Sequence, residues 1–259
     1  MQRILVLLGM LLIASLSIIS SSYAGGIQPI PSLNKVLDEA RSFTSAKNNT
    51  TSLQEKEFLI KKLYYQIQYQ AQNLEILNEV KGHFEKSISK AEEKYDEGEE
   101  GISQSDITKL KLGLAGTLND IYEIDTDLQI SRLSLSDSLQ NKYQPEAELK
   151  EPNILPVEFK LEDYQTWVGQ NGDNRKDLLL KKAFLKVNEA RQKMHLAKKN
   201  RKMTRALLIS EVANYDFGIG DPGDLFQALI IYTRVLNGYH DSVYNFNLSV
   251  AKLVRDKNS

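Results

Sequence analysis

The stretch Tyr215-Asp216-Phe217-Gly218-Ile219-Gly220-Asp221-Pro222-Gly223-Asp224 separates two long segments with helical periodicity. Three glycines and one proline fall within its last seven residues, a density that ends one helix and starts another. Asp224 stands directly before Leu225, where a carboxylate is well placed to cap a new helix. The stretch therefore predicts the tight tip of an antiparallel helical hairpin.

Apolar residues on both sides of this tip recur at alternating spacings of four and three, which is the heptad pattern of a coiled coil. The seam after the tip comprises Leu225, Leu229, Tyr232, Leu236, Tyr239, Val243, Phe246, Val250 and Leu253. The seam before the tip comprises Leu180, Ala183, Val187, Ala190, Met194 and Ala197. We therefore expect a coiled-coil hairpin over residues 175–256.

The first half of the chain repeats this plan over residues 53–140. One apolar face includes Leu63, Ile67, Ala71, Leu74, Leu77, Phe84, Ile88 and Ala91, and the other includes Ile107, Leu110, Leu114, Leu118, Ile121, Leu128, Leu135 and Leu139. The tip residues Tyr95, Asp96 and Gly98 match the second tip at an offset of 120, and Asp106-Ile107 matches at 118. Matched tips predict an internally duplicated hairpin.

The remaining segments read as connections and as a targeting signal. Five of the six prolines fall in residues 25–52 and 141–174, which we expect to be linkers. Residues 1–24 combine Arg3, an apolar run and a small-residue site ending at Ala24, which predicts a cleavable signal peptide rather than a retained anchor. Export would place the protein in the periplasm, in possible association with the outer membrane.

The Tyr-x-x-Gly tips followed by an Asp-hydrophobic restart resemble the hairpin tips of the TolC outer membrane efflux protein family. In that family Asp-Val or Asp-Leu follows the tip glycine by six residues, as Asp224-Leu225 follows Gly218 here. The stretch 214–228 also resembles a subgroup with a Gly-x-Gly-Asp-x-x-Asp-Leu-Phe tip. Together with the helical periodicity, the resemblance predicts an all-α chain of two long antiparallel coiled-coil hairpins. We expect little or no β structure, because the sequence shows no pattern of barrel strands.

The resemblance also implies partners. Family members are trimers whose hairpins form a periplasmic tunnel, and whose tips meet the periplasmic adaptor or inner-membrane pump component. By resemblance, the tip residues that contact this partner are Tyr95, Gly98, Asp106, Ile107, Tyr215, Gly218, Gly220, Asp221, Asp224 and Leu225. The resemblance therefore implies a protein partner at the tips. It also implies a homotrimer, whereas the four helices could alternatively close their own core as a monomeric bundle.

Two functions remain open at this point. Each family repeat carries two barrel strands of ~9–11 residues, and no such pair stands out here. The chain thus reads as a shortened member that lacks the β-barrel strands. It is either a helical component of an envelope efflux machine or a soluble periplasmic scaffold or adaptor that does not conduct.

Composition favours neither catalysis nor nucleic-acid binding. The chain has 33 basic and 34 acidic residues, no cysteine, and three histidines without metal-ligand spacing. The acidic tips do not match the spacing of a calcium-binding EF-hand loop. We therefore expect no catalytic residues, no cofactor and no metal site, and we do not expect an enzyme.

Overall fold

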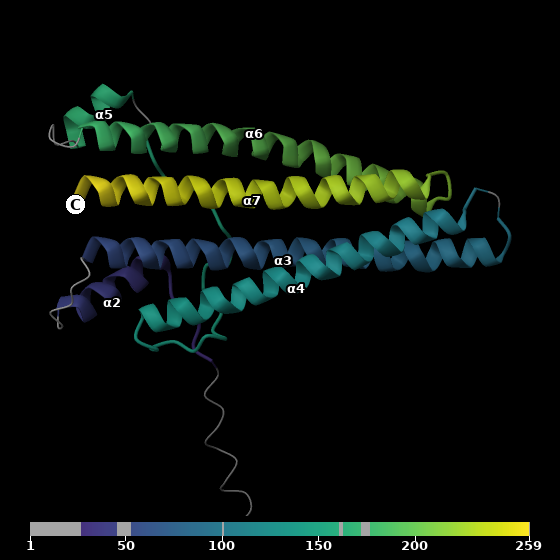
Figure 1. The fold of residues 1–259 in the computed structure, drawn as a ribbon, viewed down its shortest axis with the longest axis horizontal. Helices are drawn as coiled ribbons and strands as arrows, with labels where there is room; N and C mark the ends of the chain where they lie inside the picture. Colours follow the sequence, from purple (N-terminus) through teal and green to yellow (C-terminus); the bar gives the residue numbers. More distant parts are fainter. Residues whose placement is uncertain (1–26, 46–52, 100, 161–162, 172–176, 259) are drawn as a thin grey trace, which may run out of the picture.

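Four long helices dominate the computed structural model, which describes residues 27–45, 53–99, 101–160, 163–171 and 177–258 (Figure 1). Helices α3 (Leu53–Asp96) and α4 (Gln104–Ser138) form one antiparallel hairpin, and α6 (Asp177–Asp216) and α7 (Pro222–Asn258) form the other. The described residues contain no β-strand, and only an isolated bridge joins Ile30 to Leu149. The expected all-α class, with two long helical hairpins, is confirmed.

The helices bury the apolar positions that the heptad pattern selects. All nine seam residues of α7, from Leu225 to Leu253, are buried, as are the first five of the α6 seam. In α4 the pattern is weaker, because Leu114, Leu118 and Ile121 are only partly buried. The middle of α4 therefore packs less closely than its two ends.

The two hairpins lie side by side, with α7 and α3 in the centre and α6 and α4 on the outside (Figure 1). Both tips lie at the same end of the molecule. Within the described residues, no helix is long and apolar enough to cross a membrane.

Three buried clusters follow the long axis. The cluster nearest the tips draws on all four long helices, with Phe84, Leu110, Leu208 and Tyr232 among its members. At the opposite end one cluster lies around α3 and α4, and the other lies around α6 and α7 and includes Tyr65 of α3. The hairpins thus share buried contacts at both ends, and the cluster that draws on all four helices lies in the tip half.

The two segments that we expected to be linkers contain helices. Residues 25–52 include α2 (Leu33–Ser45), which buries Val36, Leu37 and Ala40 against the first hairpin. Residues 141–174 include α5 (Tyr164–Asn171), in which Trp167 packs on Phe184 of α6 at 5.6 Å between ring centroids. Helices of 13 and 8 residues are too short to be stable alone, so packing on the hairpins stabilises them.

The rest of the connection between the hairpins is held down by buried amide side chains. Gln68 Nε2 donates to the Glu151 carbonyl at 2.6 Å, and Asn247 Nδ2 donates to the Leu155 carbonyl at 2.8 Å. Asn247 Oδ1 also accepts from the Val157 N–H at 2.9 Å. These bonds fix an extended segment across α3 and α7. The predicted signal peptide, 1–24, lies outside the described residues.

Candidate partner-contact site at the hairpin tips

The two tips share one backbone geometry. Gly98 and Gly218 have φ of 74° and 77°, the left-handed conformation that glycine adopts without a steric penalty. The Glu99 N–H donates to the Lys94 carbonyl, and the Ile219 N–H donates to the Asn214 carbonyl, both at 3.0 Å. These bonds run from the residue after the glycine back to the last turn, as in a Schellman motif. The paired helix ends therefore agree with the sequence offset of 120.

The return helices also begin alike. Ser103 caps α4 through a capping box in which its hydroxyl accepts from the Asp106 N–H and Asp106 accepts from the Ser103 N–H. In the second tip Asp221 occupies the equivalent position, because its carbonyl accepts from the N–H groups of Asp224 and Leu225. Two tips of different composition thus start their return helices with the same turn.

The prediction that Asp224 caps α7 is wrong, because the helix begins earlier, at Pro222. Proline suits the first helical position, since its φ is already helical and the N–H that it lacks would have no partner in the helix. The carboxylate of Asp221 accepts from the Gly223 N–H at 2.5 Å. Asp224 instead lies within the first turn, where its negative charge interacts favourably with the helix dipole.

Gly220 is required by close packing rather than by its dihedral angles. A Cβ atom at this position would lie 2.8 Å from the Tyr215 backbone nitrogen and 2.9 Å from the Asn214 carbonyl carbon. Backbone atoms cannot move aside as the end of a side chain can. The tip therefore folds back tightly over the end of α6.

The two tip tyrosines differ in environment. Tyr215 is only 4% exposed, and its hydroxyl donates to the Ser87 carbonyl of α3 at 3.0 Å. Burial, with a smaller contribution from the Asp216 carboxylate, raises the pKa of Tyr215 to about 12. Tyr95 is 44% exposed. Tyr215 therefore ties the second tip to the first hairpin, whereas Tyr95 faces the surroundings.

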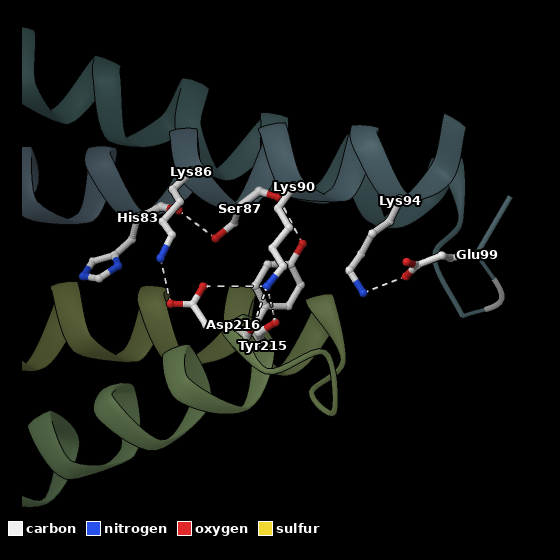
Figure 2. Close-up of polar contacts among 8 residues, drawn as sticks. All are labelled: His83, Lys86, Ser87, Lys90, Lys94, Glu99, Tyr215 and Asp216. Atoms are coloured by element: carbon white, nitrogen blue, oxygen red, sulfur yellow. Dashed lines mark hydrogen bonds and ion pairs between the residues drawn. The ribbon is translucent and has the colours of Figure 1, made fainter. Parts of the chain in front are cut away.

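A row of lysines on α3 holds the end of α6, as Figure 2 shows. Lys90 Nζ donates to the carbonyls of Tyr215 and Asp216 at 3.1 and 2.6 Å. Lys86 Nζ lies 2.7 Å from the Asp216 carboxylate, while Lys94 pairs with Glu99 of its own tip at 2.7 Å. A cation at a helix C-terminus satisfies unpaired carbonyls and interacts favourably with the helix dipole.

Sequence reasoning did not single out these lysines. Their spacing, at i, i+4 and i+8, places them on one face of α3. The spacing of these lysines can be found in the sequence, but lysines on a solvent-exposed helix face would have the same spacing. Only the position of the second hairpin shows that Lys86 and Lys90 bind the end of α6 instead of facing solvent.

The exposed surfaces of the two tips differ in character. Phe217 and Ile219 are 81% and 79% exposed at the second tip, whereas the positions 120 residues earlier carry Glu97 and Glu99. Sequence reasoning placed Phe217 and Ile219 in the tip stretch but did not include them among the residues predicted to contact a partner. The second tip therefore exposes two large apolar side chains where the first exposes two carboxylates.

The residues predicted to contact a partner fall into three groups by burial. Ile107, Leu225 and Tyr215 are buried and support the tip from inside the chain. Tyr95, Gly98, Gly218, Asp221 and Asp224 are exposed, while Asp106 and Gly220 are half-buried. The structure therefore gathers all ten at one end but leaves the exposed group, with Phe217 and Ile219, as the outer surface.

A groove beside the second tip extends this surface. It has a volume of about 380 Å³ and lies between α3, α6 and α7, with Leu208, Val212 and Phe217 among its lining residues. Tyr232 lies at its base and donates to Glu79 Oε2 at 2.9 Å. Among the described residues, no group of three acidic, histidine or cysteine side chains is arranged to hold a metal ion.

This fold and these tips define an all-helical protein of two hairpins with a TolC-like helical architecture. No family model and no curated protein matches the sequence. Among solved structures, the chain is similar to the outer-membrane channel OprN, with a TM-score of 0.62 and 11% identity. The match covers 87% of this chain and 70% of that one. At this identity the likeness concerns the fold.

Proposed function

We propose that the chain is a helical component of an envelope export or efflux machine, and that its hairpin tips contact a periplasmic partner protein. The observation that supports this most strongly is the pair of matched tips at one end of the molecule. They have the same turn geometry, and the second exposes Phe217 and Ile219. The fold likeness to an outer-membrane channel points the same way.

Homotrimer formation is part of this proposal, and the outer helices supply its surface. Most of the exposed large apolar side chains of α4 and α6 lie on one face of each helix, away from the buried seam. They are Leu112, Tyr122, Ile130 and Leu133 of α4 and Leu178, Leu185, Leu196, Met203 and Leu207 of α6. Several exposed apolar residues along one helix are expected where another helix packs against it. Each copy thus offers two apolar edges, one on each side.

The two edges match in level along the axis. Counting from the tips, Leu112 lies about two turns along α4 and Leu207 about two and a half turns along α6. Tyr122 and Leu196 lie at about five and five and a half turns. The α4 edge of one copy can therefore pack against the α6 edge of the next, which supports a closed ring.

Cross-linking between introduced cysteines tests the ring. The chain has no cysteine of its own, so the double variant Leu112→Cys, Leu207→Cys carries the only two thiols. Treated with a short bismaleimide in native membranes, it should give covalent dimers and trimers and nothing larger. The control replaces Arg205 instead of Leu207, because that position lies ~200° around α6. Monomer alone, or an open ladder, would contradict the trimer.

Cell fractionation separates this function from the non-conducting scaffold. A trimer recovered with the outer membrane supports a machine component, whereas a monomer released with the periplasmic contents supports a scaffold or adaptor. The contact at the tips is tested by a photo-reactive amino acid at Phe217. Labelling of one envelope protein other than a second copy of the chain, from Phe217 but not from exposed Leu133 at the other end of the hairpin, is the expected result.

A further inference from the structure

The loosely packed middle of α4 borders a groove between α3, α4 and α7, on a part of the molecule away from the tips. The groove has a volume of about 330 Å³, within the range of small-molecule sites. Its α4 wall carries Asp120, Glu123 and Asp127, which lie on one helix face at i, i+3 and i+7. Among the residues that the structure describes, none of these three carboxylates is paired with a cation.

The opposite wall contains two amide oxygens without a partner. Gln70 is 2% exposed, and its Oε1 accepts no hydrogen bond from the described residues. Asn237 Oδ1 of α7 is also buried and unpaired within the described chain. Both residues line the groove. A buried acceptor without a donor is costly, so it is a place where a ligand that donates hydrogen bonds is favoured.

Aromatic and polar side chains complete the groove. Tyr69 lines it, with its ring stacked on Tyr244 at 5.6 Å between centroids, and Asn73 lies beside it. Burial raises the pKa of Tyr69, and the charges of Asp241 and Asp127 add to this shift. Asp127 is therefore close enough for its charge to act on the Tyr69 side of the groove.

These features call for one kind of ligand. It must carry positive charge to offset three carboxylates, and it must donate hydrogen bonds to two carbonyl oxygens. A metal ion fits poorly, because it needs convergent ligands and no group of described acidic side chains converges in that way. An ammonium group on an alkyl chain supplies charge and three donors, and a tyrosine ring favours a cation beside it.

We propose that the groove bordered by Asp120, Glu123, Asp127, Gln70 and Asn237 binds an alkylammonium group. A free linear polyamine and a lysine side chain from a second copy are the two sources of this group. The carboxylates along α4 are spaced over ~10 Å, which suits a chain with more than one amine. The proposal does not depend on the export function, because the groove is separate from the tips.

Isothermal titration of the purified chain with spermidine at low ionic strength tests the site. We expect one binding site and about ten-fold weaker binding in Asp127→Asn, equal to ~1.4 kcal/mol. Asp125→Asn is the matched control. It removes the same charge from the same helix, but Asp125 accepts from Gln129 and does not line the groove. Its affinity should stay within two-fold of the parent.

A second variant tests the buried oxygen. Gln70→Leu removes the amide while keeping a similar volume, and we expect at least five-fold weaker binding with an unchanged helical circular dichroism spectrum. Absence of spermidine binding, or equal losses in the Asp127 and Asp125 variants, would overturn the proposal. Displacement of spermidine by an equal concentration of Ca²⁺ would also overturn it.

Sedimentation distinguishes the two sources. If the chain self-associates, and spermidine disperses the parent complex as Asp127→Asn does, the ammonium group is a lysine of a second copy. If the association state is unchanged while spermidine binds, the ligand is a free amine. Either result supports the groove as an ammonium site.

Discussion

Gly113 on α4 packs against aromatic rings of both hairpins, and its replacement by alanine tests the packing of the tip half. A Cβ atom at this position would lie 2.6 Å from two ring carbons of Phe84 on α3 and 2.9 Å from a ring carbon of Phe226 on α7. Phe84 and Phe226 pack on each other at 6.2 Å between ring centroids. The added methyl group must therefore displace two aromatic rings in a buried cluster.

The expected magnitude follows from a nearby control. Gly116 lies in the same helix, and a Cβ there would meet nothing within 4 Å. Gly116→Ala gains ~1 kcal/mol of helix propensity and loses no packing. Gly113→Ala gains the same propensity but overpacks the core, which costs ~1–3 kcal/mol. The free energy of unfolding of Gly113→Ala should thus lie ~1–3 kcal/mol below that of Gly116→Ala.

Urea denaturation followed by circular dichroism measures this difference, provided that the transition is two-state and the slopes agree. For a chain of this size the gap corresponds to about 3–10 °C in Tm. Equal stabilisation by both alanines would refute the packing argument. A double-mutant cycle with Phe84→Leu adds a second check, because a smaller side chain should relieve the clash and give a coupling energy of ~1 kcal/mol.

Three other changes have defined outcomes. Burial lowers the pKa of His240 to about 4, from 6.5 in the unfolded chain. Between these values only the unfolded chain binds a proton. The free energy of unfolding should therefore have its full value above pH 6.5 and fall by ~3 kcal/mol towards pH 4. His240→Asn should reduce this pH dependence of stability in urea titrations. Lys90→Met removes the donor to the Asp216 carbonyl and should cost ~1 kcal/mol, with faster hydrogen exchange confined to the last turns of α6. Gly218→Ala places a side chain at φ 77° and should lower the free energy of unfolding by ~1 kcal/mol, although the site has room for a methyl group.

The long helices and the two tips could be predicted because their signals are local. Heptad spacing selects the buried face of a helix wherever the partner lies, as Leu229 and Val243 of α7 show. A glycine with left-handed φ, as at Gly98 and Gly218, ends a helix through bonds to residues only a few positions away. These features depend on neighbours in sequence, so the sequence alone determined them.

Other features depended on residues far apart in sequence. The helices α2 and α5 are short, and they exist because Val36 and Trp167 find a surface on the hairpins. Lys90 can donate to the Asp216 carbonyl only because the tertiary fold brings the end of α6, 126 residues away in sequence, next to α3. No pattern in the sequence predicts which distant carbonyl group will accept a hydrogen bond from a lysine.

The sequence by itself determined two duplicated helical hairpins with glycine tips. The tertiary structure alone decided that Tyr215 is buried while Tyr95 is exposed, and that Gln70 and Asp127 border one groove. The physical reason is the range of the forces involved. Helix periodicity and capping act within a few residues, whereas burial and electrostatic environment depend on every element that packs nearby.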